Sequence, residues 1–422
     1  MSSRDDIVIT GVGVVSPIGI GRQPFWESLL SGTSGVGPIT LFDPSALPVR
    51  FGGELKGFDP KDYVQPRKAI KLMARELQTA FAAASLATKD AGLEVASLDH
   101  DRLGVLYGSE MLFGDPNELA QIYQQSIDEG QFHIWNFGGK ILTELYPLWM
   151  LKYLPNMAAC HVGISHDARG PNNTIVQDDA SSLLAVCEAV HVMQRGHADV
   201  MIVGGVGSRL SLSPLIFRGD TDLSHRHESP QQASRPFDLH RDGMVNGEGA
   251  AAFVFERRSH AEARGAKPLC QILGFSRMFG SSSAGTAPPA TETITRSING
   301  ALQDAGASAS DIGHVNAHGL GTIAGDRAEA IAIASTLGDT PVTAPKSFFG
   351  NLGAGSGAVE MAATVLALHS GTVPHTLNFE TPDPECPVNV ISHQAAPLKN
   401  DAAMVLSQSA IGHAAAVVLG VA

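Results

Sequence analysis

The chain has 422 residues, of which 42 are acidic and 29 are basic, and its formal net charge is −13. With 44% hydrophobic and only 17% charged residues, the composition excludes a disordered chain, which needs low hydrophobicity and a high density of charge. The acidic balance also argues against a nucleic-acid partner, because contacts with the phosphate backbone require clustered Lys and Arg.

The cysteines are few and scattered, and none of them forms a C-x-x-C pair. A disulfide framework needs more cysteines, and a zinc site or redox motif needs paired spacing, so we expect none of these. The charged first residues, 1–6, lead directly into an apolar run, which is unlike a signal peptide. No apolar stretch reaches the roughly 18 residues of a membrane-spanning helix, and we expect a cytoplasmic protein. The cysteines are Cys160, Cys187, Cys270 and Cys386.

Short apolar runs alternate with alanine-rich stretches over the whole length of the chain. The apolar runs lack the polar–apolar alternation of a half-exposed strand, so we predict strands that are covered on both faces. Alternating strands and helices predict an α/β fold. The predicted strands are 7–10, 103–107, 200–203, 251–255, 314–317 and 403–406, and the predicted helices are 72–91, 181–195, 293–305 and 328–337.

A glycine cluster follows the first predicted strand. Residues 11–16 imitate the start of a dinucleotide-binding motif, but Ser16 occupies the place of the third glycine and Pro17 follows it. We therefore interpret the cluster as a tight turn at the end of a strand.

Residues 111–154 differ from the rest because they hold Trp135, Trp149 and several Tyr and Phe residues. We interpret them as an insertion that carries exposed or interface aromatic side chains. The alternative is a helical cap with a small core of its own.

A second break in the pattern lies near Gly265, where a charged stretch ends and a new strand is expected over 269–274. We predict a domain boundary here, between an N-terminal half, 1–264, and a C-terminal half, 265–422. The Gly- and Ser-rich residues 280–285 predict a flexible surface loop.

The most specific pattern is a series of short motifs in a fixed order. The pairs His161/His166 and His225/His227 stand outside this series and lack the spacing of metal ligands with a third partner, so we expect isolated histidines. The series comprises Gly170-Pro171, Asp178-Asp179-Ala180 before a helix, Ser234-Arg235-Pro236-Phe237-Asp238, Asn316-Ala317-His318-Gly319, Lys346-Ser347 with Asn351, and Pro374-His375-Thr376-Leu377-Asn378.

Through these motifs the chain resembles the β-ketoacyl synthase family, in particular the type II condensing enzymes that elongate acyl chains on acyl carrier protein. The likeness covers essentially the whole chain. It implies a thiolase-like fold, with two similar α/β halves stacked in a five-layer α-β-α-β-α sandwich, and a dimer. It also implies a role in fatty acid or polyketide biosynthesis, with an acyl carrier protein or an acyl thioester as partner.

Four positions of the chain match the catalytic positions of the family, and two of them are altered. The family has a cysteine nucleophile at a strand-to-helix turn, where the helix N-terminus favours the thiolate; the matching residue is Asp179. Two histidines assist decarboxylation and stabilise the oxyanion. The first matches His318, the second is replaced by Asn351, and the family's lysine is retained as Lys346.

The positions that the resemblance assigns to substrate binding are also partly altered. Thr322 of the pantetheine-binding motif remains, but Leu320 replaces its first threonine. The phenylalanine gate of the family falls at Gly412, and His413 replaces a glycine. No organic cofactor is implied. The positions that surround a bound monovalent cation in the family match Asn316, Glu360 and Ser407.

A basic stretch resembles the region by which the family docks its carrier protein. It contains Arg67, Lys68 and Lys71, followed by Arg75. An acidic protein needs such a local positive patch to attract an acidic carrier. A solvated helix face is the alternative interpretation.

Asp179 has two interpretations. An Asp just before a helix is a favoured N-cap, worth roughly 1 kcal/mol, and we expect a cap that also acts as a polar plug. Alternatively, repulsion from Asp178 could raise one carboxyl pKa of the pair and make a general acid or base.

Three functions follow from these residues. We favour a non-elongating member, similar to the chain-length factors of type II polyketide systems, in a homodimer or in a heterodimer with a cysteine-containing synthase. The second is an enzyme with altered chemistry, a malonyl decarboxylase or acyl hydrolase that uses Asp179 and His318. The third, ordinary elongation, lacks a visible nucleophile.

Overall fold

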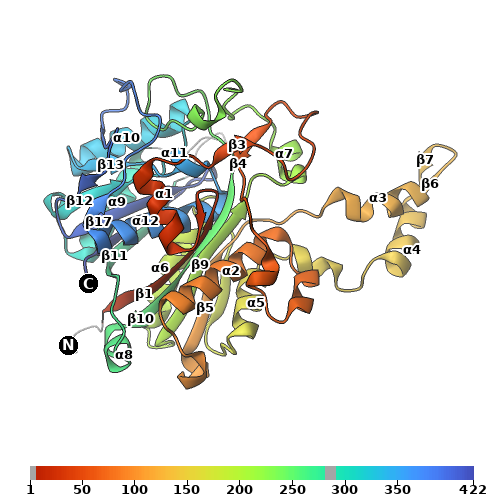
Figure 1. Ribbon diagram of the computed structural model, residues 1–422, viewed down its shortest axis with the longest axis horizontal. Helices are drawn as coiled ribbons and strands as arrows, with labels where there is room; N and C mark the ends of the chain where they lie inside the picture. Colours follow the sequence, from red (N-terminus) through yellow and green to blue (C-terminus); the bar gives the residue numbers. More distant parts are fainter. Residues whose placement is uncertain (1–5, 281–290) are drawn as a thin grey trace.

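The computed structural model describes residues 6–280 and 291–422 (Figure 1). The strands of the main sheet are β1 (Ile7–Ser16), β2 (Gly19–Ile20), β5 (Leu103–Gly108), β8 (Asn172–Ile175), β9 (Val200–Ser208), β10 (Glu248–Arg257), β11 (Cys270–Phe279), β12 (Ile312–Asn316), β13 (Pro341–Thr343), β15 (Asn389–Val390), β17 (Ala402–Gln408) and β18 (His413–Gly420). The principal helices are α1 (Arg22–Ser31), α2 (Arg75–Asp90), α5 (Met157–Ser165), α6 (Ser181–Gln194), α7 (Leu212–Arg218), α8 (Arg258–Ala263), α9 (Thr291–Ala305), α10 (Ile323–Leu337), α11 (Lys346–Phe349) and α12 (Ser356–Ser370).

The strands follow the order β15-β13-β12-β17-β18-β11-β1-β10-β9-β5-β8, with β2 paired to β1. Both halves of the chain mix the two pairing modes in the same way. In the first half β1, β10 and β9 pair antiparallel and β9, β5 and β8 pair parallel. In the second half β11, β18 and β17 pair antiparallel, and β17, β12, β13 and β15 pair parallel.

The helices divide the strands into layers. Helix α6 contacts β5 and β9 of the first half and β11 and β18 of the second, and α12 contacts β1, β9, β10 and β17, so these two helices lie between the halves. Helices α2 and α5 cover the outer face of the first half, and α9, packed against α10, covers that of the second. The predicted five-layer arrangement of two similar α/β halves is therefore confirmed. The boundary between residues 264 and 265 stays a prediction.

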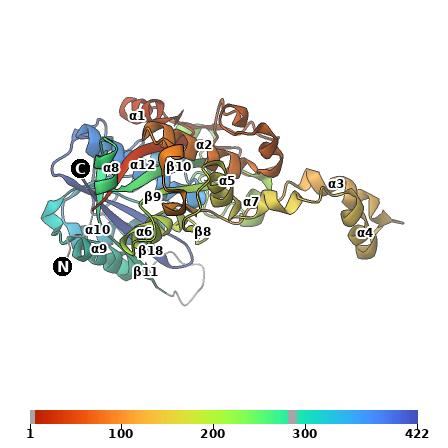
Figure 2. The same ribbon diagram turned by 90° about the horizontal axis from the view of Figure 1, so that it is seen from below.

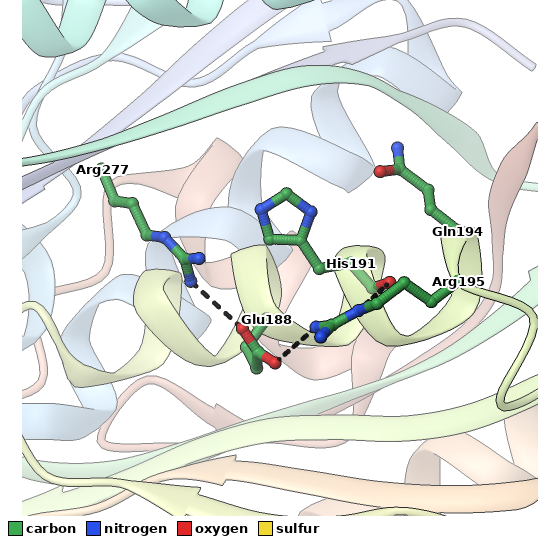
Figure 3. A pocket seen from close by; sticks show the side chains of 5 residues that line it. All are labelled: Glu188, His191, Gln194, Arg195 and Arg277. Carbon is green, nitrogen blue, oxygen red and sulfur yellow. Dashed lines mark hydrogen bonds and ion pairs between the residues drawn. The ribbon is translucent and has the colours of Figure 1, made fainter.

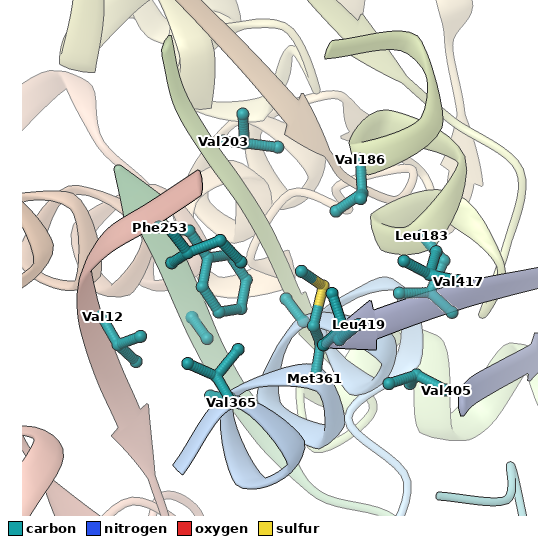
Figure 4. Close-up of a cluster of buried hydrophobic side chains, with 14 of the residues drawn as sticks. Val12, Leu183, Val186, Val203, Phe253, Met361, Val365, Val405, Val417 and Leu419 are labelled. Carbon is teal, nitrogen blue, oxygen red and sulfur yellow. The ribbon is translucent and has the colours of Figure 1, made fainter. Parts of the chain in front are cut away.

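A continuous core fills the space between the central helices and both groups of strands (Figure 4). Because α6 and α12 are covered on both sides, they carry apolar side chains around most of their circumference. The labelled core residues are Val12, Val203 and Phe253 from the first half, Leu183 and Val186 on α6, Met361 and Val365 on α12, and Val405, Val417 and Leu419 from the second half.

The predicted elements correspond to observed ones, and their ends differ by a few residues. The helix predicted over 72–91 begins at Arg75, because Met73 and Ala74 are extended and end a short 3-10 helix, η2 (Arg67–Leu72). The predicted loop 280–285 lies, apart from Gly280, outside the described residues.

The prediction of a tight turn at residues 11–16 is wrong, because these residues continue strand β1. Their glycines allow α2 to pack closely on the strand. A Cβ atom at Gly11 would lie 2.4 Å from the Ala87 carbonyl oxygen, and one at Gly13 would lie 2.0 Å from that of Ala83. The cluster thus reflects close strand–helix packing.

Part of the insertion at 111–154 forms an arm that projects from the body (Figures 1 and 2). It contains α3 (Pro116–Gln125), a hairpin of β6 (Ile127–Asp128) and β7 (Gln131–Phe132), and α4 (Ile134–Glu144). The rings of Tyr123, Phe132 and Phe137 form a small cluster, with centroids 4.6–5.9 Å apart. No residue of α4 is buried, and Trp135 is 89% exposed. The arm therefore combines a minimal core of its own with exposed apolar side chains.

Within the described residues, no helix has the length and apolar character needed to cross a membrane.

Candidate functional site

The turn between β8 and α6 carries the two adjacent aspartates. Asp178 has a positive φ of 53°, and Asp179 is 4% exposed. The N-cap of α6 is Ala180, and no side chain caps the helix. The prediction that Asp179 caps the helix is therefore wrong, because its carboxylate binds side chains from other elements instead of the first amides of α6.

Both oxygens of the Asp179 carboxylate have side-chain partners. Arg209, just after β9, donates from its NH2 group to Oδ1 at 2.5 Å, and Asn351, after α11, donates from Nδ2 to Oδ2 at 3.0 Å. Burial by itself would raise the pKa of Asp179, but the Arg209 guanidinium outweighs it and lowers this pKa. Asp179 is thus an ionised polar plug.

Arg209 is the residue of the site that the sequence analysis missed. Its side chain is 7% exposed, and the same NH2 group also reaches Asp178 Oδ1 at 3.2 Å. Its Nε atom is buried and has no hydrogen-bond partner. The signal in the sequence that could have revealed this role is the position of Arg209 directly after the apolar strand β9. A guanidinium that is buried there requires an acidic partner.

The net pKa shifts of Asp178 and Asp179 are opposite, although burial by itself raises both. Burial and the neighbouring Asp179 raise the pKa of Asp178, whereas Asp179 is kept ionised by Arg209. The predicted repulsion within the pair therefore raises the pKa of Asp178, because the ionised Asp179 carboxylate disfavours a second negative charge beside it.

His318 is held from two sides. Glu329 accepts hydrogen bonds from the backbone amides of His318 and Gly319, both at 2.8 Å. Lys346 Nζ lies 3.1 Å from His318 Nδ1 and donates to the His318 carbonyl at 2.8 Å. Because an ammonium group can only donate, Nδ1 is an acceptor and the proton of the neutral ring is on Nε2.

The charge on Lys346 is balanced by Glu360, to which Nζ also donates. Burial and the Lys346 charge lower the pKa of His318 well below its usual value. The imidazole is therefore neutral and can act as a hydrogen-bond donor through Nε2, but it is a poor base.

The Asn351 side chain forms hydrogen bonds through both its nitrogen and its oxygen. Besides its bond to Asp179, its Oδ1 accepts from the Gly353 amide at 3.0 Å and from Ser356 Oγ at 2.9 Å. The amide orientation is thereby determined, and its donor group faces the Asp179 carboxylate. The structure thus joins Asp179 to Asn351 and His318 to Lys346; the catalytic assignment of these four residues stays a prediction.

Of the three residues expected around a monovalent cation, Asn316 and Glu360 contact each other, and Ser407 contacts the Asp179 backbone. Asn316 Nδ2 donates to the Glu360 carbonyl at 2.7 Å, and Ser407 Oγ donates to the Asp179 carbonyl at 3.0 Å. Asn316 Oδ1 and Glu360 Oε2 are buried and have no partner. Two unpartnered oxygens, one of them from a carboxylate, are suitable ligands for a hard cation.

The predicted substrate-binding residues lie at the ends of α10 and β18. Thr322 is the N-cap residue of α10. Gly412 has a φ of 105°, and a Cβ atom there would lie 2.1 Å from the Gly280 carbonyl oxygen, so this backbone excludes a phenylalanine gate. The His413 ring lies 4.9 Å from that of Phe279.

The predicted docking residues Arg67, Lys68 and Lys71 are all exposed on η2. Arg75 does not belong with them. It is half-buried and binds the Glu248 carboxylate through Nε and NH2 at 2.7 and 2.9 Å, because it lies on the first turn of α2, which faces the body.

No cysteine in the described residues lies at the turn before α6. Cys187 is buried within α6, and burial raises its pKa to about 12. Cys270 and Cys386 are buried, and Cys160 is half-buried on α5. Burial disfavours a thiolate at Cys187, so this thiol does not serve as a nucleophile.

A separate surface cavity of about 420 Å³ lies along the later turns of α6 (Figure 3). Glu188 lies between the two arginines that line the cavity and binds Arg195 at 2.9 Å and Arg277 at 3.2 Å. Since the carboxylate already engages both guanidinium groups, this cavity does not present an unpaired charge from these residues.

Comparisons with known proteins agree with this architecture. The model described as "Beta-ketoacyl synthase, N-terminal domain" matches residues 4–261, and the corresponding C-terminal domain model matches residues 269–380. A 3-oxoacyl-[acyl-carrier-protein] synthase 2 from Synechocystis is 36% identical over 414 residues, covering 96% of either chain.

Two solved structures extend the comparison. The ishigamide ketosynthase/chain length factor matches with a TM-score of 0.86 and 27% identity over the whole of both chains. A type II polyketide ketosynthase, solved in complex with its acyl-carrier protein, matches with a TM-score of 0.85 and 27% identity, again over both whole chains.

Proposed function

Because the chain belongs to the β-ketoacyl synthase family, we propose that it is a non-elongating subunit of a fatty acid or polyketide synthase system. In this proposal Asp179 replaces the catalytic cysteine and Asn351 replaces the second histidine. The subunit keeps the fold and the carrier interaction of the family, while a cysteine-containing partner performs the condensation.

The observation that carries the proposal is the binding of both Asp179 oxygens. A carboxylate that is held by Arg209 at 2.5 Å and by Asn351 at 3.0 Å is a weak nucleophile, because attack on a thioester would require it to leave both donors. Even if attack occurred, the mixed anhydride formed would hydrolyse readily. The site therefore does not store an acyl chain.

The same contacts disfavour a malonyl decarboxylase or acyl hydrolase. A general base needs a pKa near the working pH, whereas Arg209 lowers that of Asp179. The Asn351 donor is engaged by Asp179, and the neutral His318 is a poor base that could offer a substrate oxygen one donor, Nε2. Other groups would be needed to complete an oxyanion site.

A second subunit is supported by the arm and by one of the solved structures. The outer side chains of α4, Ile134, Trp135 and Leu142, are 61%, 89% and 86% exposed, and exposed apolar groups of this kind mark interaction surfaces. The ishigamide structure is a ketosynthase/chain length factor. We propose a dimer in which the arm contacts the partner, either a second copy or a cysteine-containing synthase.

The carrier protein and the cation complete the proposal. Arg67, Lys68 and Lys71 supply an exposed positive patch on an otherwise acidic chain, which suits an acidic carrier. Asn316, Glu360 and Ser407 are proposed to hold a monovalent cation, and the two unpartnered oxygens of this group support that assignment.

Acyl labelling tests the central proposal. The purified chain is incubated with acyl carrier protein that bears a radiolabelled acyl thioester, and protein-bound label is counted after denaturation. We expect no stable covalent label. A thioester adduct at any of the four cysteines would refute the non-elongating function.

Co-purification from the native host tests the partner. We expect a cysteine-containing relative to be recovered at a one-to-one ratio with the tagged chain. Recovery of the homodimer alone would count against the heterodimer and would leave a second copy as the partner.

A further inference from the structure

The group around Asp179 has the composition of a site for a bound carboxylate. Arg209 and Asn351 converge on it from different elements, and they are 6% and 1% exposed. Neither residue is a neighbour of Asp179 in sequence. A buried guanidinium with a convergent amide donor is a typical arrangement for recognising a carboxylate group.

The donor capacity of Arg209 exceeds what Asp179 uses. The Asp179 carboxylate contacts Arg209 through one oxygen and one nitrogen, while its other oxygen binds Asn351. Arg209 Nε remains buried without a partner. A carboxylate that was free to turn could engage Nε and NH2 side by side, which is the stronger, bidentate geometry.

The surrounding charges leave Arg209 as the cation that faces this position. Glu360 balances Lys346, and Arg218 lies 3.5 Å from the buried carboxylate of Glu110. His318 is uncharged, since burial and Lys346 lower its pKa. Asp178 shares Arg209 with Asp179, but its bond is longer, 3.2 Å, and its side chain is 26% exposed.

We infer that Arg209 and Asn351 form a binding site for a small monocarboxylate and that the Asp179 side chain is its resident ligand. The native site is therefore occupied by the protein's own side chain. A carboxylate-bearing substrate cannot bind Arg209 and Asn351 there, because Asp179 already does. This inference concerns binding alone and holds whether or not the chain has a synthase partner.

Removal of the resident ligand tests the inference directly. In the full-length Asp179→Ala variant, sodium formate should raise the melting temperature in a saturable manner, by about 3 °C at concentrations near 100 times its dissociation constant. Sodium chloride at the same ionic strength serves as the control. The unaltered chain should show no such formate effect, because Asp179 fills the site.

The matched variant Asp179→Ala/Arg209→Met removes the guanidinium of the proposed binding site together with the resident carboxylate. It should lose the formate response and should melt higher than Asp179→Ala measured without formate, because no unpaired guanidinium remains. Equal formate responses in the single variant, the double variant and the unaltered chain would overturn the inference.

If Asp179→Ala does not fold, a milder set of variants decides the question. Asp179→Asn keeps the shape but removes the charge, and it is compared with Arg209→Met and with the double variant by urea unfolding. Strong coupling between the two substitutions means that the double variant unfolds at a higher urea concentration than either single variant. This result supports the proposed carboxylate-binding site. Additive effects would refute it.

Discussion

At the scale of single residues, the site retains balanced charges at its centre. Arg209 is paired with Asp179, and Lys346 with Glu360, and all four side chains are less than a tenth exposed. Removing one member of a buried ion pair costs about 3–5 kcal/mol, because the other charge is left without a partner. The residue at position 179 is thus tied to Arg209 and is not free to vary independently.

A buried histidine outside the site also makes the stability of the protein depend on pH. His314 on β12 is 1% exposed, and burial lowers its pKa to about 3. Between pH 6.5, the ordinary pKa of the side chain, and about pH 3, His314 is protonated in the unfolded chain but not in the folded chain. This residue therefore reduces stability as the pH falls through that range, by about 1.4 kcal/mol per pH unit.

We predict that His314→Gln removes this part of the acid sensitivity. The free energy of unfolding of the variant, relative to the unaltered chain, should rise steadily between pH 6.5 and pH 4.5 in urea titrations. The matched control is His197→Gln at an exposed position, which should leave the pH profile unchanged. Parallel profiles for His314→Gln and the unaltered chain would contradict the prediction.

At the scale of elements, the distance between β1 and α2 depends on glycines that have no side chain to pack. The two elements enclose much of the outer core of the first half. A Cβ atom at Gly13 or Gly11 would collide with the carbonyl oxygen of Ala83 or Ala87 on α2. Since both contacts involve backbone atoms, a larger side chain could be accommodated only by moving the whole helix.

Gly13→Ala should therefore destabilise the protein by about 3 kcal/mol, the upper end of the usual cost of overpacking. The measurement is the urea midpoint at constant slope. Gly37→Ala is the matched control, because it also lies in a strand, β3 (Val36–Pro38), but has nothing within 4 Å of its Cβ position. Equal effects of the two substitutions would show that α2 moves freely.

At the scale of the whole molecule, the arm is the part that the body does not stabilise. It joins the body through Glu118, which accepts hydrogen bonds from Trp149, Lys152 and Tyr153 of the 3-10 helix η5 (Trp149–Tyr153). Beyond this anchor, α4 lies away from the body (Figure 2), and none of its residues is buried. A partner that covers α4 would remove this apolar surface from water.

Substitution of Trp135 and Leu142 by Ser tests this role of the arm. The double variant should keep its circular dichroism spectrum and melting temperature but bind its partner at least about 30-fold more weakly, because large apolar anchors dominate interface energies. Light scattering and co-purification report the assembly. Gln124→Ser, an exposed polar position on α3, is the control. An unchanged assembly would exclude α4 from the interface.

Much of this protein follows from the sequence alone, because it depends on patterns that are local along the chain. Apolar runs and alanine-rich stretches indicated the strands and helices, and the ordered motifs indicated the family, the five-layer fold and Asp179, His318, Lys346 and Asn351 as candidate site residues. Such patterns record burial and turn geometry, which act over a few residues.

Only the tertiary structure decided what these residues do to each other. It showed that Arg209, 30 residues from Asp179, binds the carboxylate that local reasoning assigned to the helix cap, since a buried guanidinium needs an opposite charge as its partner. It also showed that the first glycine cluster serves helix packing and that the aromatic arm points outward. Each outcome depends on partners that are distant in sequence and are brought together by folding.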